Sequence, residues 1–406
     1  MNIRTLVAVI FAITLGLLQG IFTIYIGGLE ESLVHKFHLF SPTFSNANAA
    51  LLFGSALGVL VIGPWIDLIG VGLIGILCSL LTTVGMYLFT ISSASSGFII
   101  SEFAIGVGLS IWYPAPVYIF RNHLPASHLP YWIGFLMAVN GLGNASISLI
   151  NLSSRWLGIV STDNIMLGLC FFNLILACIL FSQSDISLKT IDVKPKSLYG
   201  QLFRLLTKPS IFWISLTQAL SAIYNFIFLP LWSIAFFSQV TDINTASIIA
   251  SSTLFINGFG GLLLAPLYSR WLNPLNWLNL QFGITFFCIL PISILPESSF
   301  NEAIIFACMW SSAFVLSANN AYANTYMTNQ VPPSLAGGVS TITMIIFQLF
   351  VAILTFLMGY ALDLTSYLSD ISITSFANYQ NGINIYLFTI LLSMIMVYFL
   401  NRRSQT

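Results

Sequence analysis

The feature that most constrains this chain is its near lack of charge over long stretches. The 406 residues contain 12 Lys and Arg and 12 Asp and Glu, so only 6% of the chain is charged while 57% is hydrophobic. The mean hydropathy is +0.94. A water-soluble domain has about 25% charged residues, because its surface must face water. The composition therefore excludes a soluble protein and indicates one that folds within a lipid bilayer.

Twelve segments are long and apolar enough to cross a bilayer, which takes about 20 apolar residues. They run over 4–27, 46–69, 71–92, 97–120, 130–152, 164–183, 209–236, 245–269, 274–295, 301–325, 334–362 and 383–401. We expect an all-α integral membrane protein, because a chain in lipid must satisfy its backbone hydrogen bonds internally.

The chain divides near its middle. The longest polar interval, Ser182 to Ser210, carries five of the twelve basic residues. We predict a six-helix half over 1–183, a cytoplasmic linker over 184–208 and a second six-helix half over 209–406.

An internal repeat supports this division. The stretch "GSALGVLVIGPWIDLIG" (54–70) aligns with "INGFGGLLLAPLYSRWL" (256–272) at a constant offset of 202 residues. Gly58 then meets Gly260, and Pro64 meets Pro266. Both stretches fall in the second span of their half, so the two halves are predicted to be related by pseudo-symmetry.

The distribution of basic residues predicts the orientation, because cytoplasmic loops collect Lys and Arg. With the N-terminus inside, ten basic residues fall on the inner side and two, Lys36 and Arg155, on the outer side. We expect a multi-pass cell membrane protein with both termini in the cytoplasm. Short loops favour a bacterial inner membrane.

A short motif carries a family resemblance. The stretch "GPWIDLIGVG", Gly63 to Gly72, is similar to the signature loop of the major facilitator superfamily, with an Asp four residues after the first Gly and a Gly three further. The resemblance covers the whole organisation of the chain and implies a secondary transporter of that fold. It assigns the loop and gating positions to Gly58, Gly63, Asp67, Gly70 and Arg270. The usual basic residues after the Asp are absent. We expect Gly58 and Gly63 to pack the second span against the other half.

One acid lies within a predicted span. The stretch "EFAIGVG" resembles the family's fourth-span pattern Arg-x-x-x-Gly-x-Gly, with Glu102 in place of the Arg. An ionisable group inside a span is costly, which favours a function such as binding and releasing a proton. In the alternative, Glu102 extends outward to the membrane interface and has no role in transport.

Polar groups within the spans predict the substrate site, since transporters of this type bind between their halves near midplane. The candidates are Gln19, Trp112, Tyr113, Asn140, Asn144, Gln218, Tyr224, Asn225, Asn319, Asn320 and Asn324. The alternative is that these amides only join helices by hydrogen bonds. Since no Lys or Arg lies deep in a span, the candidates favour a neutral or zwitterionic metabolite such as an amino acid, nucleoside or sugar.

The sequence lacks the common motifs for ATP binding, for hydrolytic enzymes and for metal sites. There is no Gly-x-x-x-x-Gly-Lys-Ser/Thr loop for ATP, no His-Glu-x-x-His and no Gly-x-Ser-x-Gly. The five cysteines lie inside spans without metal-ligand spacing. We therefore expect no enzyme, cofactor or metal. The expected partners are a small-molecule substrate, a proton and the lipid bilayer, with no nucleic acid, and the chain is expected to act as a monomer.

The expected mechanism is proton-coupled uptake by alternating access. Two alternatives remain open: an exporter of hydrophobic compounds, consistent with the 34 Phe residues, and a transport-inactive receptor or scaffold.

Overall fold

The structure is a computed structural model of the chain. It describes residues 3–28, 41–123, 129–157, 162–182, 200, 204–205, 207–271, 274–296, 302–319, 323, 326–327, 336–369 and 376–405. All statements below concern these residues.

The first half of the chain runs across the helical bundle six times. One of these six passes is divided into three helices. The helices of this half are α1 (Ile3–Gly28), α3 (Ser41–Ile69), α4 (Val71–Ile91), the divided pass α5 (Ser95–Leu109), η1 (Ser110–Trp112) and α6 (Pro114–His123), then α7 (Leu129–Leu157) and α8 (Thr162–Ser182).

The second half also makes six passes. Its helices are α10 (Pro209–Ser221), η3 (Tyr224–Trp232) and α11 (Ser233–Phe237) in one pass, then α12 (Ile243–Trp271), α13 (Pro274–Ile294), α14 (Glu302–Leu316), α16 (Ala336–Ser369) and α17 (Phe376–Gln405). Ten stretches of the described chain are long and apolar enough to span a membrane. With α7 and the shorter apolar helix α14 they make up the twelve predicted spans, so the all-α membrane fold is confirmed. The linker predicted at 184–208 lies largely outside the described residues.

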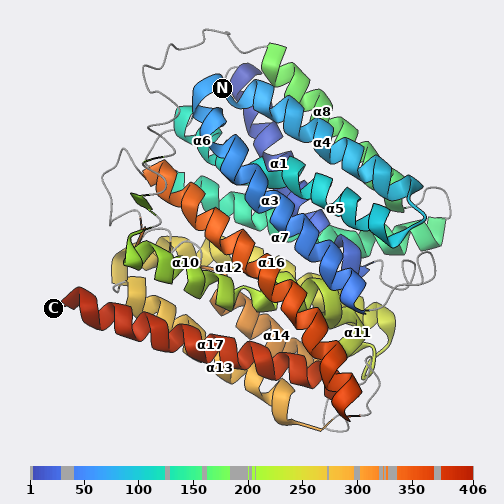
Figure 1. The fold of residues 1–406 in the computed structure, drawn as a ribbon, viewed down its shortest axis with the longest axis vertical. Coiled ribbons are helices and arrows are strands. Elements are labelled where there is room, and N and C mark those ends of the chain that lie inside the picture. The colour runs from blue at the N-terminus through green and yellow to red at the C-terminus, as the bar shows by residue number, and fades with distance from the viewer. Residues whose placement is uncertain are drawn as a thin grey trace.

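The two halves lie side by side and meet along three pairs of helices. Figure 1 shows the first half above the second, with α16 alongside α3. Contacts between the halves join α3 to α16, α7 to α12 and α1 to η3. Each pair combines one helix from each half, so the interface runs through the centre of the molecule.

Two passes lose regular α-helical geometry where they border this interface. The fourth changes to a 3₁₀ turn at Ser110–Trp112 ahead of Pro114. The seventh is π-helical over Tyr224–Trp232 and contains Pro230. Proline has no backbone N–H, so it cannot complete the helical hydrogen-bond ladder. Irregular backbone of this kind is tolerated in a membrane where protein surrounds it, and π-helical turns are frequent at functional sites.

The second and third passes are separated by a single glycine. Gly70 has φ +85° and is the N-cap of α4. A side chain at this left-handed φ would strain the backbone, so glycine is favoured there. This accounts for the second Gly of the predicted signature loop in terms of backbone geometry.

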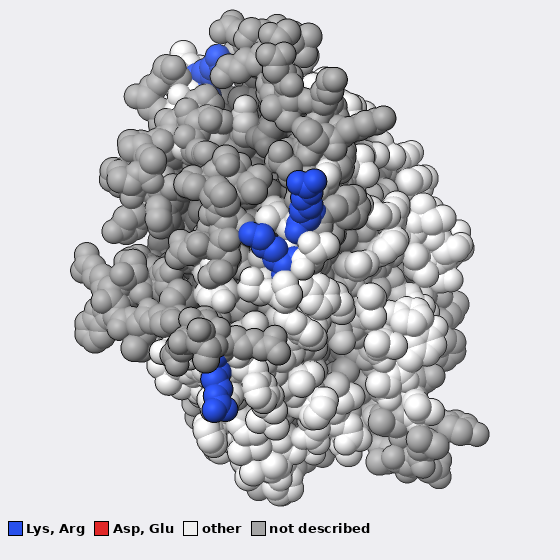
Figure 2. Space-filling model, turned by 60° about the vertical axis from the view of Figure 1, so that its left-hand side comes forward, with Lys and Arg blue, Asp and Glu red and all other residues white. Residues whose placement is uncertain are grey.

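Charge is divided between the two ends of the bundle. Both termini lie at the left-hand ends of the helices in Figure 1. Figure 2 turns that side forward and shows Lys and Arg, and no Asp or Glu, among the described residues of this face. Of the four acids whose side chains are described, Asp163, Asp242 and Glu302 lie at the beginnings of α8, α12 and α14, and Glu102 lies in the middle of α5. Acids at helix beginnings are stabilised by the helix dipole.

Asp242 shows how one of these acids is held. Its Oδ1 accepts hydrogen bonds from the backbone N–H groups of Asn244 (2.9 Å) and Thr245 (3.1 Å), and its Oδ2 accepts one from the Thr245 hydroxyl (2.5 Å). These bonds, the Thr245 hydroxyl first, hold the pKa of this exposed carboxyl below its usual range. Asp242 therefore caps α12 as an anion.

Candidate functional site: a polar cavity between the two halves

A cavity lies at the interface between the halves. Its volume is about 90 Å³. Both halves line it: the first through Trp112, Tyr113, Met137, Asn140 and Asn144, the second through Gln218, Ser221, Ala222, Asn225, Phe226, Leu254, Asn257, Gly258, Leu316, Ser317, Asn319, Thr343, Met344 and Phe347. None of these described lining residues is charged.

An amide chain on α7 forms the polar wall of the first half. Asn140 Nδ2 donates to the backbone carbonyl of Gly16 in α1 at 3.3 Å. Asn144 Nδ2 in turn donates to Asn140 Oδ1 at 3.5 Å. Asn140 and Asn144 are four residues apart, so they stack on one side of the helix, as their spacing predicts.

A second chain of hydrogen bonds forms the wall of the other half. The Ser221 hydroxyl donates to the backbone carbonyl of Gln218 at 2.9 Å. Asn319 Nδ2 donates to Ser221 Oγ at 2.7 Å. This chain joins α10 to the end of the tenth pass, at the level where the seventh pass becomes π-helical.

Aromatic rings complete the cavity. Trp112 and Tyr113 form an edge-to-face pair with ring centroids 5.6 Å apart. Both belong to the irregular part of the fourth pass, and the Trp112 side chain is 5% exposed. Phe226 and Phe347 line the second half and also meet edge to face, at 5.3 Å. Rings of this kind offer flat apolar surfaces beside the amides.

The structure brings together most of the predicted binding residues. Trp112, Tyr113, Asn140, Asn144, Gln218, Asn225 and Asn319 all line this one cavity. Asn140, Gln218 and Asn225 thus lie together between the halves, and their role in substrate binding stays a prediction. Asn320 and Asn324, with which Asn319 was grouped, lie outside the described residues.

Two predicted binding residues are not among those that line the cavity. Gln19 is buried in α1, where its Nε2 approaches Thr23 Oγ1 at 3.4 Å. Tyr224 is buried inside the second half, stacks on Tyr386 at 5.1 Å and accepts a hydrogen bond from Ser312 Oγ at 3.0 Å. Tyr224 and Asn225 are neighbours, and successive helical side chains point in different directions, so only Asn225 reaches the cavity.

Four polar residues of the cavity wall were not among the predicted binding candidates. Ser221, Asn257, Ser317 and Thr343 contribute polar groups to the cavity. The only signal for Asn257 was its place in the repeat, one position before Gly258. Serine and threonine are frequent in membrane helices, where they bond back to their own backbone, so their presence in a span carries little information.

The two glycines that were expected to contact the other half, Gly58 and Gly63, have neighbours in different halves. A Cβ atom at Gly63 would lie 3.2 Å from Thr341 Cγ2 of α16, so Gly63 does pack against the other half as predicted. A Cβ atom at Gly58 would lie 2.5 Å from Ser110 Cβ of its own half, so the prediction is wrong for Gly58. Gly260, its partner in the repeat, likewise meets Ser317 and Phe314 within its own half. The side chains of Asp67 and Arg270 are outside the described set.

Glu102 is buried within the first half. Its side chain is 0% exposed, so the alternative that it extends outward to the membrane interface is wrong. Neither carboxylate oxygen has a hydrogen-bond partner among the described residues. The hydroxyl of Tyr25 in α1 donates to Asp163 at the beginning of α8. The Tyr25 ring packs on Phe89, whose ring packs on Phe98, one turn before Glu102. Three ionisable groups from three passes thus lie in one part of the half.

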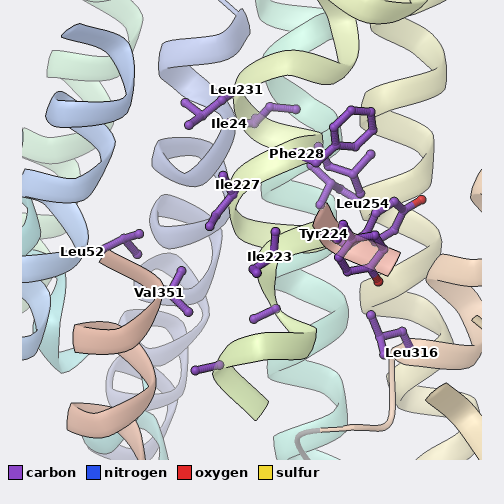
Figure 3. Packing of buried hydrophobic residues seen from close by; sticks show 14 of the residues in the cluster. Ile24, Leu52, Ile223, Tyr224, Ile227, Phe228, Leu231, Leu254, Leu316 and Val351 are labelled. Atoms are coloured by element: carbon purple, nitrogen blue, oxygen red, sulfur yellow. The ribbon is translucent and has the colours of Figure 1, made fainter. Parts of the chain in front are cut away.

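Contacts between the halves lie on both sides of the cavity. Toward the end of the bundle that carries the termini, Gly63 meets Thr341, and a Cβ atom at Gly134 would lie 3.4 Å from Leu262 Cα. Toward the other end, apolar side chains from both halves form one buried cluster. Figure 3 shows Ile24 of α1 beside Leu231 of η3, and Leu52 of α3 near Val351 of α16.

One polar contact lies on the same side as this apolar cluster. Asn48 of α3, which is 3% exposed, donates from Nδ2 to the backbone carbonyl of Phe226 at 3.3 Å. The Phe226 carbonyl belongs to the π-helical stretch Tyr224–Trp232. An amide of the first half therefore bonds to the irregular stretch of the second.

Solved structures of known transporters are similar in fold to this chain. The chain is similar in fold to the crystal structure of the nucleoside transporter NupG (D323A mutant), with a TM-score of 0.74 and 11% identity over 96% of this chain and 99% of that one. A bacterial homologue of the human lysosomal transporter Spinster, in an inward-facing and unoccupied conformation, also gives a TM-score of 0.74, with 14% identity over 99% and 98% of the two chains.

A D-xylose-proton symporter gives 0.73, with 13% identity over 97% of each chain. No curated protein matches the sequence. The family model of the Major Facilitator Superfamily matches residues 6–355. A match over most of the chain, together with two six-helix halves and a cavity between them, shows that this protein belongs to the Major Facilitator Superfamily.

Proposed function

We propose that this member of the Major Facilitator Superfamily is a secondary active transporter that takes up a small, uncharged or zwitterionic metabolite together with a proton. The observation that carries the proposal is the cavity: both halves line it, and its described lining consists of amides, hydroxyls and aromatic or apolar side chains without a charge. A small solute that contacts both halves at once can link its own movement across the membrane to the movement of one half against the other.

The proton is assigned to Glu102. An ionised carboxylate that is fully buried without a partner is costly, whereas a carboxylate that reaches water in another conformation can exchange its proton. Glu102 lies in the same divided pass as the lining residues Trp112 and Tyr113. A conformational change of that pass would therefore affect the carboxylate and the cavity together. The neighbouring fold of a D-xylose-proton symporter supports coupling of this kind.

Proteoliposomes test both parts of the proposal. The purified protein is reconstituted, and uptake of pooled radiolabelled sugars, nucleosides and amino acids is followed with and without an inward pH gradient. We expect accumulation that needs the gradient. Glu102→Gln should retain exchange of the same solute and lose accumulation, because the amide has the shape of the protonated acid and cannot release a proton.

Glu302→Gln provides the matched control. Glu302 is an exposed acid in the first turn of α14, so its replacement should leave gradient-driven uptake unchanged. Full accumulation by the Glu102→Gln variant would refute the proton role. Efflux of apolar compounds against the gradient would favour an exporter, and absence of any transport by the wild-type protein would favour a receptor or scaffold.

A further inference from the structure

The tenth pass is interrupted within the membrane. Its helix α14 has 15 residues and ends at Leu316, which gives a length of about 22 Å at 1.5 Å per residue. A bilayer core is about 30 Å thick, so α14 ends before it has crossed. Ser317 and Ala318 form a turn, and the chain is helical again at Asn319. Leu316, Ser317 and Asn319 all line the cavity, so the interruption lies at the candidate site.

The turn removes a helical donor from the last turn of α14. In a continuous helix the N–H of Ser317 would donate to the carbonyl of Ala313, four residues back. Here it donates to the Phe314 carbonyl at 3.3 Å. Asn257 Nδ2 of α12 donates to the Ala313 carbonyl at 2.9 Å in its place. An unsatisfied carbonyl is costly in lipid, and this one is satisfied by a side chain from another pass.

A second amide comes from α13, a helix that contributes no residue to the cavity wall. Gln281 of α13 is 3% exposed, and its Nε2 donates to the Val315 carbonyl at 2.8 Å. Because a backbone carbonyl can only accept, the Gln281 amide must turn its NH₂ group toward Val315. Any effect of Gln281 on a bound solute therefore passes through the interrupted turn of the tenth pass.

The neighbouring helix α12 packs closely on the same turn. A Cβ atom at Gly260 would lie 3.0 Å from the Phe314 carbonyl oxygen, and one at Gly261 would lie 3.3 Å from the Ser317 carbonyl oxygen. The turn is therefore held by close packing of α12 and by amide bonds from both α12 and α13.

We propose that Gln281 is a positioning residue for the substrate site: its bond to Val315 holds the turn so that Ser317 and Asn319 keep their places in the cavity wall. Asn319 in turn donates to the Ser221 hydroxyl of α10 at 2.7 Å, so the position of the turn also affects that contact. A solute binds to the arrangement in which the wall is assembled, and its apparent affinity falls with the population of that arrangement. The effect on transport rests on the proposed function.

The first test measures how firmly the turn is held and needs no substrate. Hydrogen–deuterium exchange of the 313–319 backbone amides is compared between the purified wild-type protein and Gln281→Met, which keeps the length of the side chain and removes the donor. Loss of the bond should speed exchange there about 2- to 13-fold. Gln380→Met is the matched control, because the Gln380 amide bonds in the same way to the carbonyls of Ile292 and Leu295 at the end of α13. It should speed exchange at the end of α13 and leave 313–319 unchanged.

The second test measures transport. Uptake of D-xylose, uridine and L-serine by proteoliposomes is followed over a range of concentrations. For the solute that is taken up, Gln281→Met should raise KM about 2- to 13-fold at an unchanged maximal rate, whereas Gln380→Met, which lies outside the cavity wall, should change neither.

Three results separate the alternatives. Unchanged exchange at 313–319 in Gln281→Met would overturn the proposal. Faster exchange there with an unchanged KM would also overturn it, since the bond would then stabilise the fold without affecting the site. No uptake of any of the three solutes by the wild-type protein would contradict the proposed function, while faster exchange at 313–319 would still support the role of Gln281 in holding the turn.

Discussion

Removal of the Asn48 side chain should open the cavity on the side away from the termini. The bond from Asn48 Nδ2 to the Phe226 carbonyl joins the two halves, and Asn48 is 3% exposed. If alternating access separates α3 from η3 on that side, the bond exists only in the closed arrangement. Asn48→Ala then removes a stabilising contact from one state and leaves the other unaffected.

The bond is part-buried, and loss of a typical hydrogen bond costs about 0.5–1.5 kcal/mol. A difference of this size between two states shifts their equilibrium about 2- to 13-fold. Ser45 lies three residues before Asn48 and is 0% exposed, so Ser45→Cys can report the opening. A membrane-impermeant maleimide should label Ser45→Cys faster by that factor in the presence of Asn48→Ala.

A control separates loss of an interface bond from general loosening. Asn378→Ala removes a chemically similar bond, from Nδ2 to the Leu362 carbonyl at 3.1 Å, that lies within the second half. It should lower thermal stability without changing the labelling rate of Ser45→Cys. An unchanged labelling rate in Asn48→Ala, or an equal rise in both variants, would show that the Asn48 bond does not hold the halves together on that side.

Three further predictions concern packing and topology. Gly106→Ala should lower the thermal stability of the purified protein by about 1–3 kcal/mol, because its Cβ would meet the Leu51 carbonyl oxygen, whereas Gly168→Ala, with open space around it, should not; equal melting temperatures would refute this. Gly63→Leu should reduce gradient-driven uptake at normal membrane abundance, because it enlarges the contact with Thr341; unchanged uptake would show that the contact does not limit the cycle. Reporter fusions should place the C-terminus and the 184–208 segment in the cytoplasm, as the Lys and Arg bias predicts, and an external C-terminus would contradict it.

The fold class can be predicted from the amino-acid sequence alone. Long apolar runs with almost no charge leave only helices that span a bilayer, because unsatisfied backbone groups are too costly in lipid. The offset repeat and the basic interval divided these helices into halves. The spacing of Asn140 and Asn144 placed them on one helix face, and the structure confirms that both line the cavity.

Which polar side chains meet could be seen only in the packed arrangement of the helices. Gln19 and Tyr224 lie on membrane spans as Asn225 does, and helical periodicity alone does not say which face of a span turns toward the other half. Tyr224 stacks inside its own half, and Asn225 lines the cavity. The same holds for Gly58, which contacts its own half, and Gly63, which contacts the other. Asn140 donates to a backbone carbonyl of α1 and Asn319 donates to the Ser221 hydroxyl of α10, so both amides bond to helices distant in sequence. Such bonds arise from packing between passes, which local sequence does not encode.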